Sequence, residues 1–168
     1  MSRKQKRVFL ALGWCGLHSA AQSPGIRPVG ANGQPLNLDF ETGDLRDWTA
    51  EGNAFDGQPI RGDTVAPRRP DMVSNHTGNF WIGTYERAGD APKGTLTSAP
   101  FKVTQPWASF RMAGGTSPRT QVEIVATRPA SGNQPAGEEP VFKVSGLETE
   151  TMRPVVVDLA KWVGREIR

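Results

Sequence analysis

The chain has 168 residues, of which 36% are hydrophobic, 19 are glycine and 14 are proline, with a formal net charge of +3. This length allows one domain with its own core, and the many turn residues without long apolar stripes exclude a helical bundle and favour an all-β fold. Residues 1–21 contain four basic side chains and no acidic one, so residues 22–168 carry a net charge of −1. The excess of basic residues therefore lies in the N-terminal segment, and we expect no nucleic-acid partner.

The first 21 residues have the organisation of a secretory signal peptide. A basic segment at residues 3–7 precedes ten mostly apolar residues, 8–17, which are too few to span a bilayer. Residues 19–21 supply the small side chains of a cleavage site. The alternative is an N-terminal helix that stays on the protein. A cleaved signal predicts a protein that is secreted, periplasmic or on the cell surface, with no membrane span after signal removal.

Cys15 is the only cysteine and lies within the predicted signal, so we expect no disulfide in the mature chain. The sequence has no Cys-x-x-Cys-His motif, so we expect no haem on this chain. A secreted domain of this kind must be stabilised by its core, by a metal or by neighbouring domains.

Residues 22–35 are rich in proline and glycine and predict a linker. The domain is then expected to occupy residues 36–168. Its first strand is predicted at 36–41, where the apolar side chains alternate with polar ones. After a turn, Trp48 is expected to return to the core.

Residues 78–101 predict two strands joined by a loop. Alternation within 80–86 would place Trp81, Gly83 and Tyr85 on one face. The Gly, Asp and Pro residues that follow are typical of a loop, and a second strand is expected to begin at Thr95.

The rest of the chain predicts further short strands. They are expected at residues 99–103, 107–113, 121–127, 141–144, 153–159 and 165–168, with a short helical turn at 160–164. In 107–113 the alternation places Phe110 and Met112 on one face and Trp107 and Arg111 on the other, although the size of Trp107 favours the core. Seven or eight short strands without a long helix predict an all-β, antiparallel two-sheet β-sandwich of the jelly-roll type.

Five segments follow one another in an order typical of a known family. They are LDFETGDLRDW at 38–48, FWIGTYE at 80–86, GDAPKGTLTSAPF at 89–101, SFRMAGG at 109–115 and VVVDLAKWVGREIR at 155–168. Together they resemble the galactose-binding-like, carbohydrate-binding-module-type jelly roll of large secreted bacterial proteins. Similar domains are found with planctomycete-type cytochrome c modules and with fructan-hydrolase-like enzymes.

The resemblance covers residues 36–168 and implies a domain without its closing strand. Domains of this family continue with a Trp-Gly-His type motif and an Asp-rich strand, which this sequence does not contain. We therefore expect a fragment of a larger multidomain protein, with an unpaired sheet edge that favours marginal stability or association.

A structural calcium between the first and closing strands is also implied by the resemblance. It nominates Glu41 as a ligand, with Asp39 as a second candidate, because calcium prefers carboxylate and other hard oxygens. The alternative is that both residues belong to the polar outer face of a strand.

No catalytic set is evident in the sequence. The acidic pairs at 138–139 and at 148 and 150 read as solvated surface residues, and His76 has no nucleophile motif beside it. Residues 75–77 form a glycosylation sequon, which marks a surface loop. We therefore expect no enzyme activity.

Sugar binding is the leading functional prediction. Trp81 and Tyr85 are the aromatic candidates for stacking on a sugar ring, with Arg111 and Lys143 as polar partners. The alternative for Trp81 is a place in the core. The prediction is a non-catalytic, secreted, carbohydrate-binding accessory module that contacts a polysaccharide or glycan. The alternative is a structural or protein-interaction domain that spaces a cytochrome c or hydrolase module and contacts neighbouring domains.

Overall fold

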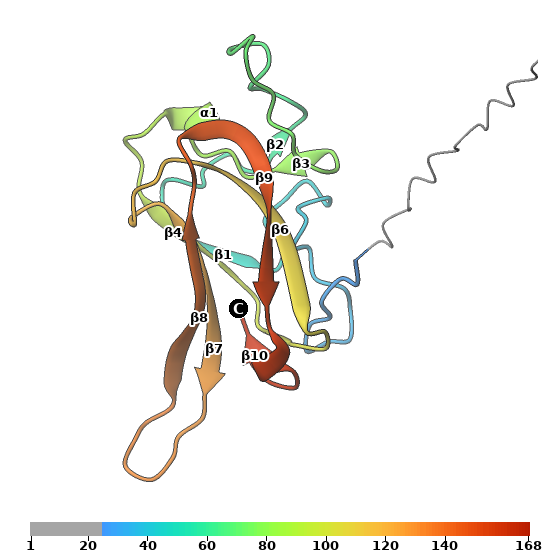
Figure 1. Cartoon of the computed structure of the whole chain (residues 1–168), viewed down its shortest axis with the longest axis vertical. Helices are drawn as coiled ribbons and strands as arrows, with labels where there is room; N and C mark the ends of the chain where they lie inside the picture. The colour runs from blue at the N-terminus through green and yellow to red at the C-terminus, as the bar shows by residue number, and fades with distance from the viewer. Residues whose placement is uncertain (1–24) are drawn as a thin grey trace, which may run out of the picture.

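The structure is a computed structural model that describes residues 25–168. The predicted signal peptide lies outside the described residues. Figure 1 shows that strands dominate the described part. Its helical segments are one short α-helix and one 3₁₀ turn. The elements are β1 (Trp48–Gly52), β2 (Ile60–Arg61), β3 (Phe80–Trp81), α1 (Tyr85–Ala88), β4 (Gly94–Ser98), β5 (Phe101–Lys102), β6 (Trp107–Gly114), β7 (Gln121–Arg128), β8 (Gly137–Ser145), β9 (Thr149–Asp158), the 3₁₀ turn η1 (Ala160–Trp162) and β10 (Glu166–Ile167).

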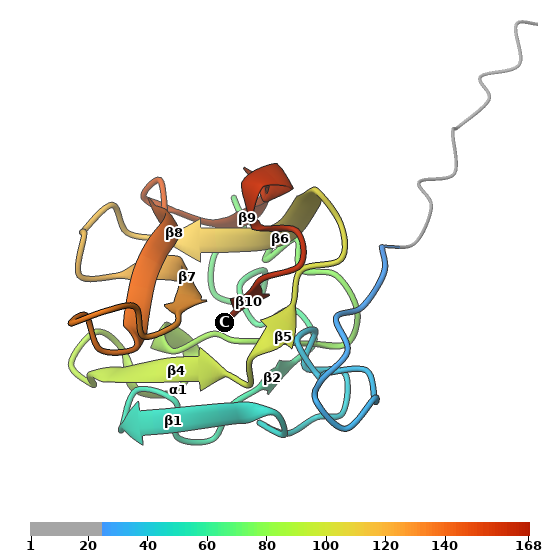
Figure 2. The ribbon, with the colours of Figure 1, turned by 90° about the horizontal axis from the view of Figure 1, so that it is seen from below.

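The strands form one four-stranded sheet and three two-stranded sheets, and the named pairs are antiparallel. The four-stranded sheet has the order β5-β10-β7-β8. In Figure 2 the β6–β9 pair lies above this sheet and the β1–β4 pair below it. The layered arrangement confirms the predicted all-β, antiparallel, sandwich-like class.

The main core lies between the four-stranded sheet and the β6–β9 pair. Ala126 of β7 and Ile167 of β10 are almost completely buried, as are Val155 and Val157 of β9. Met112 on β6 is buried beside them, which confirms the inward face predicted for that strand. Alternating side chains on paired strands thus supply the hydrophobic contact between the two layers.

A second, smaller core lies under β2, β3 and the loop between them. Ile60, Val65 and Trp81 are buried there, and Met72 and Met152 pack against them. Met152 belongs to β9, the same strand that contributes Val155 and Val157 to the main core. Strand β9 therefore connects the two cores.

The strand predicted at 36–41 does not form, because local side-chain hydrogen bonds hold these residues in turns. The buried amide of Asn37 donates to the carbonyls of Asp44 (3.0 Å) and Arg46 (3.3 Å) and accepts from the backbone N–H of Thr42 (3.2 Å). Phe40 adopts a φ of 61°, which no strand contains. Its ring stacks on Trp48 at 5.0 Å, so Trp48 begins β1 half-buried against a turn.

The strand predicted at 80–86 is also wrong beyond its first two residues, since β3 ends at Trp81 and α1 begins at Tyr85. The side chain of Gln58 accepts a hydrogen bond from the backbone N–H of Gly83 (2.9 Å) and donates one to its carbonyl (3.0 Å). Both backbone groups of Gly83 are then unavailable to a neighbouring strand. The face predicted for Trp81, Gly83 and Tyr85 therefore does not exist.

Strand β10 lies inside the four-stranded sheet, between β5 and β7. Ile167 pairs with Phe101 on one side and with Ala126 on the other, and Arg168 and Val125 exchange backbone hydrogen bonds of 3.0 and 3.1 Å. The edges of this sheet are β5 and β8.

Candidate ligand-binding surfaces

Trp81 is a core residue in the structure. Only 9% of its surface is exposed, and its indole N–H donates to the carbonyl of Gly62 at 2.8 Å. The ring of His76 stacks on it with centroids 5.9 Å apart. These contacts favour the core alternative, because they cover the ring that was predicted to stack on a sugar.

Tyr85 lies on α1 and is 49% exposed. The guanidinium of Arg68 lies 4.8 Å from the centroid of the Tyr85 ring, in the geometry of a cation–π contact. One face of this ring is therefore occupied by the protein itself.

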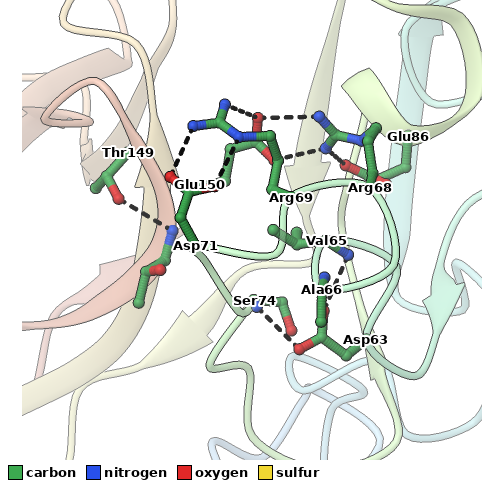
Figure 3. Close-up of polar contacts among 11 residues, drawn as sticks. Asp63, Val65, Ala66, Arg68, Arg69, Asp71, Ser74, Glu86, Thr149 and Glu150 are labelled. Carbon is green, nitrogen blue, oxygen red and sulfur yellow. Dashed lines mark hydrogen bonds and ion pairs between the residues drawn. The ribbon is translucent and has the colours of Figure 1, made fainter.

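Arg68 is the centre of an ion-pair network that joins three segments (Figure 3). Its guanidinium contacts both carboxylate oxygens of Glu150 on β9, at 3.1 and 2.5 Å, and Glu86 on α1 at 2.6 Å. The hydrogen bond to Glu150 and the pairing with Glu86 raise the pKa of Arg68 further above its already high ordinary value. Arg69 adds contacts to Asp71 (3.2 Å) and Glu150 (3.6 Å).

The same network brings two carboxylates together, which is the arrangement that glycoside hydrolysis uses. The same nitrogen of Arg68, Nη2, contacts Glu86 at 2.6 Å and Glu150 at 2.5 Å. The guanidinium of Arg68 lies between them and occupies oxygens of both carboxylates, so the protein itself fills the place that a glycosidic bond would need. The arrangement therefore fits a structural tie better than a catalytic pair.

Ser74 and His76 form another close pair, with the hydroxyl 2.6 Å from Nδ1 of the imidazole. Asp63 accepts from the backbone N–H of Ser74 (3.0 Å) and also from Val65 (2.9 Å) and Ala66 (3.1 Å) (Figure 3). Ser74 is completely buried, so no substrate can reach its hydroxyl. The three residues order the loop between β2 and β3, which sequence reasoning had treated as plain loop.

The predicted metal ligands have other partners. The carboxylate of Glu41 accepts from the backbone N–H groups of Asn79 (2.7 Å) and Phe80 (3.0 Å) and from the Asn79 amide (2.9 Å). Asp39 pairs with Arg27 at 2.6 Å. Within residues 25–168, no three His, Cys, Asp or Glu side chains are grouped so that they could hold a metal. The calcium site stays a prediction, and the observed role of Glu41 is to fix the start of β3.

Lys143 lies on β8 and pairs with Glu123 on the neighbouring strand β7 at 2.8 Å. Strand β8 is an edge of the four-stranded sheet, whereas Arg111 lies on β6, in a different sheet, and donates to the carbonyls of Asn75 and Met152. The structure therefore does not bring Lys143 together with Arg111.

The outer face of the β6–β9 pair, here called the Trp107 face, carries an exposed aromatic residue beside polar ones. Trp107 is 60% exposed, so its predicted place in the core is wrong, and Val156 is 63% exposed. The face consists of Trp107, Ser109 and Arg111 on β6 and Pro154, Val156 and Asp158 on β9. The alternation of 107–113 had already placed Trp107 with Arg111; only the general preference of large aromatic residues for the core had argued otherwise.

Register places these side chains as neighbours. Trp107 is directly opposite Asp158, Ser109 is opposite Val156, and Arg111 is opposite Pro154. The guanidinium of Arg111 donates to the carbonyls of Asn75 (3.2 Å) and Met152 (3.5 Å), which fixes it at one end of the face. An aromatic ring, a hydroxyl, a carboxylate and a guanidinium thus lie along one strip of sheet.

Comparison with known proteins gives one informative match. No family model and no solved structure matches the chain. A protein of Aspergillus rugulosus named "Putative glycosyl hydrolase ecdE" is 32% identical over 89 residues, or 51% of this chain. The chain spans only 12% of that protein's length. This chain is therefore similar to one region of a much larger protein, whose name describes it as a glycosyl hydrolase.

No helix among the described residues has both the length and the apolar character needed to cross a membrane.

Proposed function

We propose that this chain is a non-catalytic carbohydrate-binding module of a secreted protein, and that the Trp107 face is its binding surface. The observation that carries the proposal is the exposure of Trp107, at 60%, on a two-stranded sheet whose other face is firmly packed in the core. A large exposed aromatic residue is costly to leave in water, and a sugar ring is a natural partner for its flat face.

The polar residues of the Trp107 face can form hydrogen bonds with the hydroxyl groups of a sugar. A pyranose ring presents C–H groups on its face and hydroxyls around its rim, so it needs an aromatic surface with donors and acceptors beside it. Asp158 and Ser109 offer acceptors, and Arg111 offers donors, on the same side of the sheet as Trp107. Of the polar partners predicted from the sequence, Arg111 is the one that this arrangement retains.

Two further observations support the proposal. The partial likeness to a protein named as a glycosyl hydrolase is consistent with a role in carbohydrate recognition. The two carboxylates that lie closest to a hydrolytic arrangement, Glu86 and Glu150, are held by Arg68, which supports a binding role over a catalytic one.

The test is retention on insoluble polysaccharides such as cellulose, chitin and starch granules. Wild-type protein should be retained on at least one of them, and Trp107→Ala should weaken retention about tenfold or more, since burial of a large apolar side chain contributes about 1.5–3 kcal/mol and about 1.4 kcal/mol is tenfold in affinity. Tyr85→Ala is the matched control, because it removes an exposed aromatic outside the Trp107 face and should leave retention unchanged. Equal retention of W107A and wild type, or no retention of wild type on any polysaccharide, would rule the proposal out.

A second candidate function is contact with a neighbouring protein domain, which is favoured by the apolar area that Val156 and Pro154 add beside Trp107. The variant Asp158→Asn separates the two candidates. It should weaken sugar binding, because carboxylates accept strong hydrogen bonds from hydroxyls, and it should leave an apolar protein contact almost unchanged.

A further inference from the structure

A cleft lies beside the four-stranded sheet, on the side of the β1–β4 pair and away from the β6–β9 pair (Figure 2). It has a volume of about 570 Å³ and lies between the β1–β4 pair and the end of β10. Thr49 and Glu51 of β1 and Thr95 and Thr97 of β4 line it, together with Arg168. Its volume falls in the roughly 300–1,000 Å³ range of small-molecule sites.

The register shows that four of these side chains share one wall. Thr49 is directly opposite Thr97, and Glu51 is directly opposite Thr95, in the antiparallel β1–β4 pair. Residues two apart on a strand, and residues opposite one another, lie on the same face of a sheet. The wall is therefore a surface of three threonine hydroxyls and one carboxylate.

A polar wall is unusual in this position. Facing layers of a β-sandwich normally bury interlocking apolar side chains, as the β6–β9 pair does against the four-stranded sheet. The β1–β4 pair instead presents Thr49, Glu51 and Thr95 in exposed positions toward the cleft. Such a wall cannot drive packing, but it offers several hydrogen-bond donors and acceptors to a ligand.

The charges of the cleft restrict that ligand. Arg168 already pairs with Glu138 at 2.6 Å, and the Asp47 carboxylate accepts from the backbone N–H of Asn37 at 2.8 Å. The carboxylate of Glu51 faces the cleft beside the threonine hydroxyls and would repel an anionic ligand. A neutral ligand rich in hydroxyls can donate to Glu51 and exchange hydrogen bonds with the threonines.

We propose that this cleft binds a short, neutral oligosaccharide through hydrogen bonds to Thr49, Thr97 and Glu51. It is a second site, distinct from the Trp107 face, because the two surfaces share no residue. An experiment can therefore contradict the proposal for one site without contradicting the proposal for the other.

The test is titration of the protein with neutral trisaccharides of glucose, mannose, xylose and galactose, and with trigalacturonic acid, followed by backbone amide NMR shifts. At least one neutral trisaccharide should shift the amides of β1 and β4, and the galacturonate should bind at least tenfold more weakly. Thr49→Val combined with Thr97→Val removes two hydroxyls with little change of shape, and it should weaken binding about tenfold or more.

Three controls make the outcome decisive. Thr104→Val removes an exposed threonine outside the cleft and should have no effect. Glu51→Gln tests the carboxylate alone, so the proposal does not depend on one variant folding. Trp107→Ala should weaken retention on polysaccharide about tenfold or more and leave the trisaccharide shifts on β1 and β4 in place. The proposal is overturned if no trisaccharide shifts these amides at millimolar concentration, if the double threonine variant binds as wild type does, or if the galacturonate binds as tightly as the neutral sugars.

Discussion

At the scale of one residue, Glu41 shows how a single carboxylate can organise a fold. Its three hydrogen bonds come from Asn79 and Phe80, which lie almost forty positions later in the chain. Desolvation raises the pKa of Glu41, but the hydrogen bonds from Phe80 and Asn79 outweigh it and lower the pKa from its ordinary value of 4.5. The ionised carboxylate thus fixes the N-terminal turns to the start of β3.

This lowered pKa gives the stability of the protein a defined pH dependence. Because the folded-state pKa lies below the unfolded one, the contribution of Glu41 is complete above the ordinary value of 4.5 and is lost as the pH falls through the lowered pKa. Glu41→Gln should therefore be less stable than wild type at pH 7, and the gap should narrow as the pH falls below 4.5. Urea midpoints measured from neutral to acidic pH check this, and a gap that stays constant across the range would contradict it.

Residue patterns predicted the direction of some side chains but not their partners. The alternation of β6 correctly placed Met112 inward and Arg111 outward, because it depends only on the two-residue repeat of a strand. The burial of Trp81 and the exposure of Trp107 depend on what lies above each ring. Trp81 is covered by His76 and bonded to Gly62, the first residue after β2, and a local sequence pattern cannot predict such distant contacts.

At the scale of elements, strands with a continuous apolar alternation were predictable, and segments organised by side-chain hydrogen bonds were not. The strands after residue 94 form in the predicted segments, since backbone pairing and core packing favour the same register, but β8 and β9 begin at residues 137 and 149 instead of the predicted 141 and 153. The segments 36–41 and 80–86 carry a strand-like alternation, but Asn37 and Gln58 hold their backbones in turns. The partners of these two amides lie up to 25 residues away, so the sequence alone could not reveal them.

The loop between β2 and β3 is joined to two other segments by ion pairs. Arg68 joins it to Glu150 on β9 and to Glu86 on α1, and the side chains of these three residues are between 9% and 35% exposed. Ion pairs that are partly open to solvent contribute little to global stability, typically 0–1 kcal/mol, but several together can order a loop.

Arg68→Met should therefore free this loop without unfolding the domain. The expected result is faster hydrogen exchange at residues 63–74 and faster proteolysis there, with a change of no more than about 1 kcal/mol in the free energy of unfolding. Arg119→Met, in the exposed turn before β7, is the control and should leave both rates unchanged. If exchange across 63–74 stays at the wild-type rate in R68M, the ion pairs do not order the loop.

At the scale of the whole molecule, β9 and β10 decide whether the layers behave as one unit. Strand β9 packs Val155 and Val157 into the main core and Met152 into the second core. Strand β10 joins β5 to β7 in the middle of the four-stranded sheet, and β5 follows directly after β4. A disturbance of the main core should therefore reach the second core through continuous chain and shared packing.

Ile167→Ala tests this coupling. Ile167 is 2% exposed and lies in the main core, so its truncation should lower the free energy of unfolding by about 2–5 kcal/mol. Far-UV circular dichroism follows the strands, whereas tryptophan fluorescence includes Trp81, which lies in the second core. In wild type and in I167A the two signals should lose their native values at the same urea concentration, shifted together in the variant. Separate transitions, with fluorescence unmoved by the substitution, would mean that the two cores unfold independently and that β9 does not couple them.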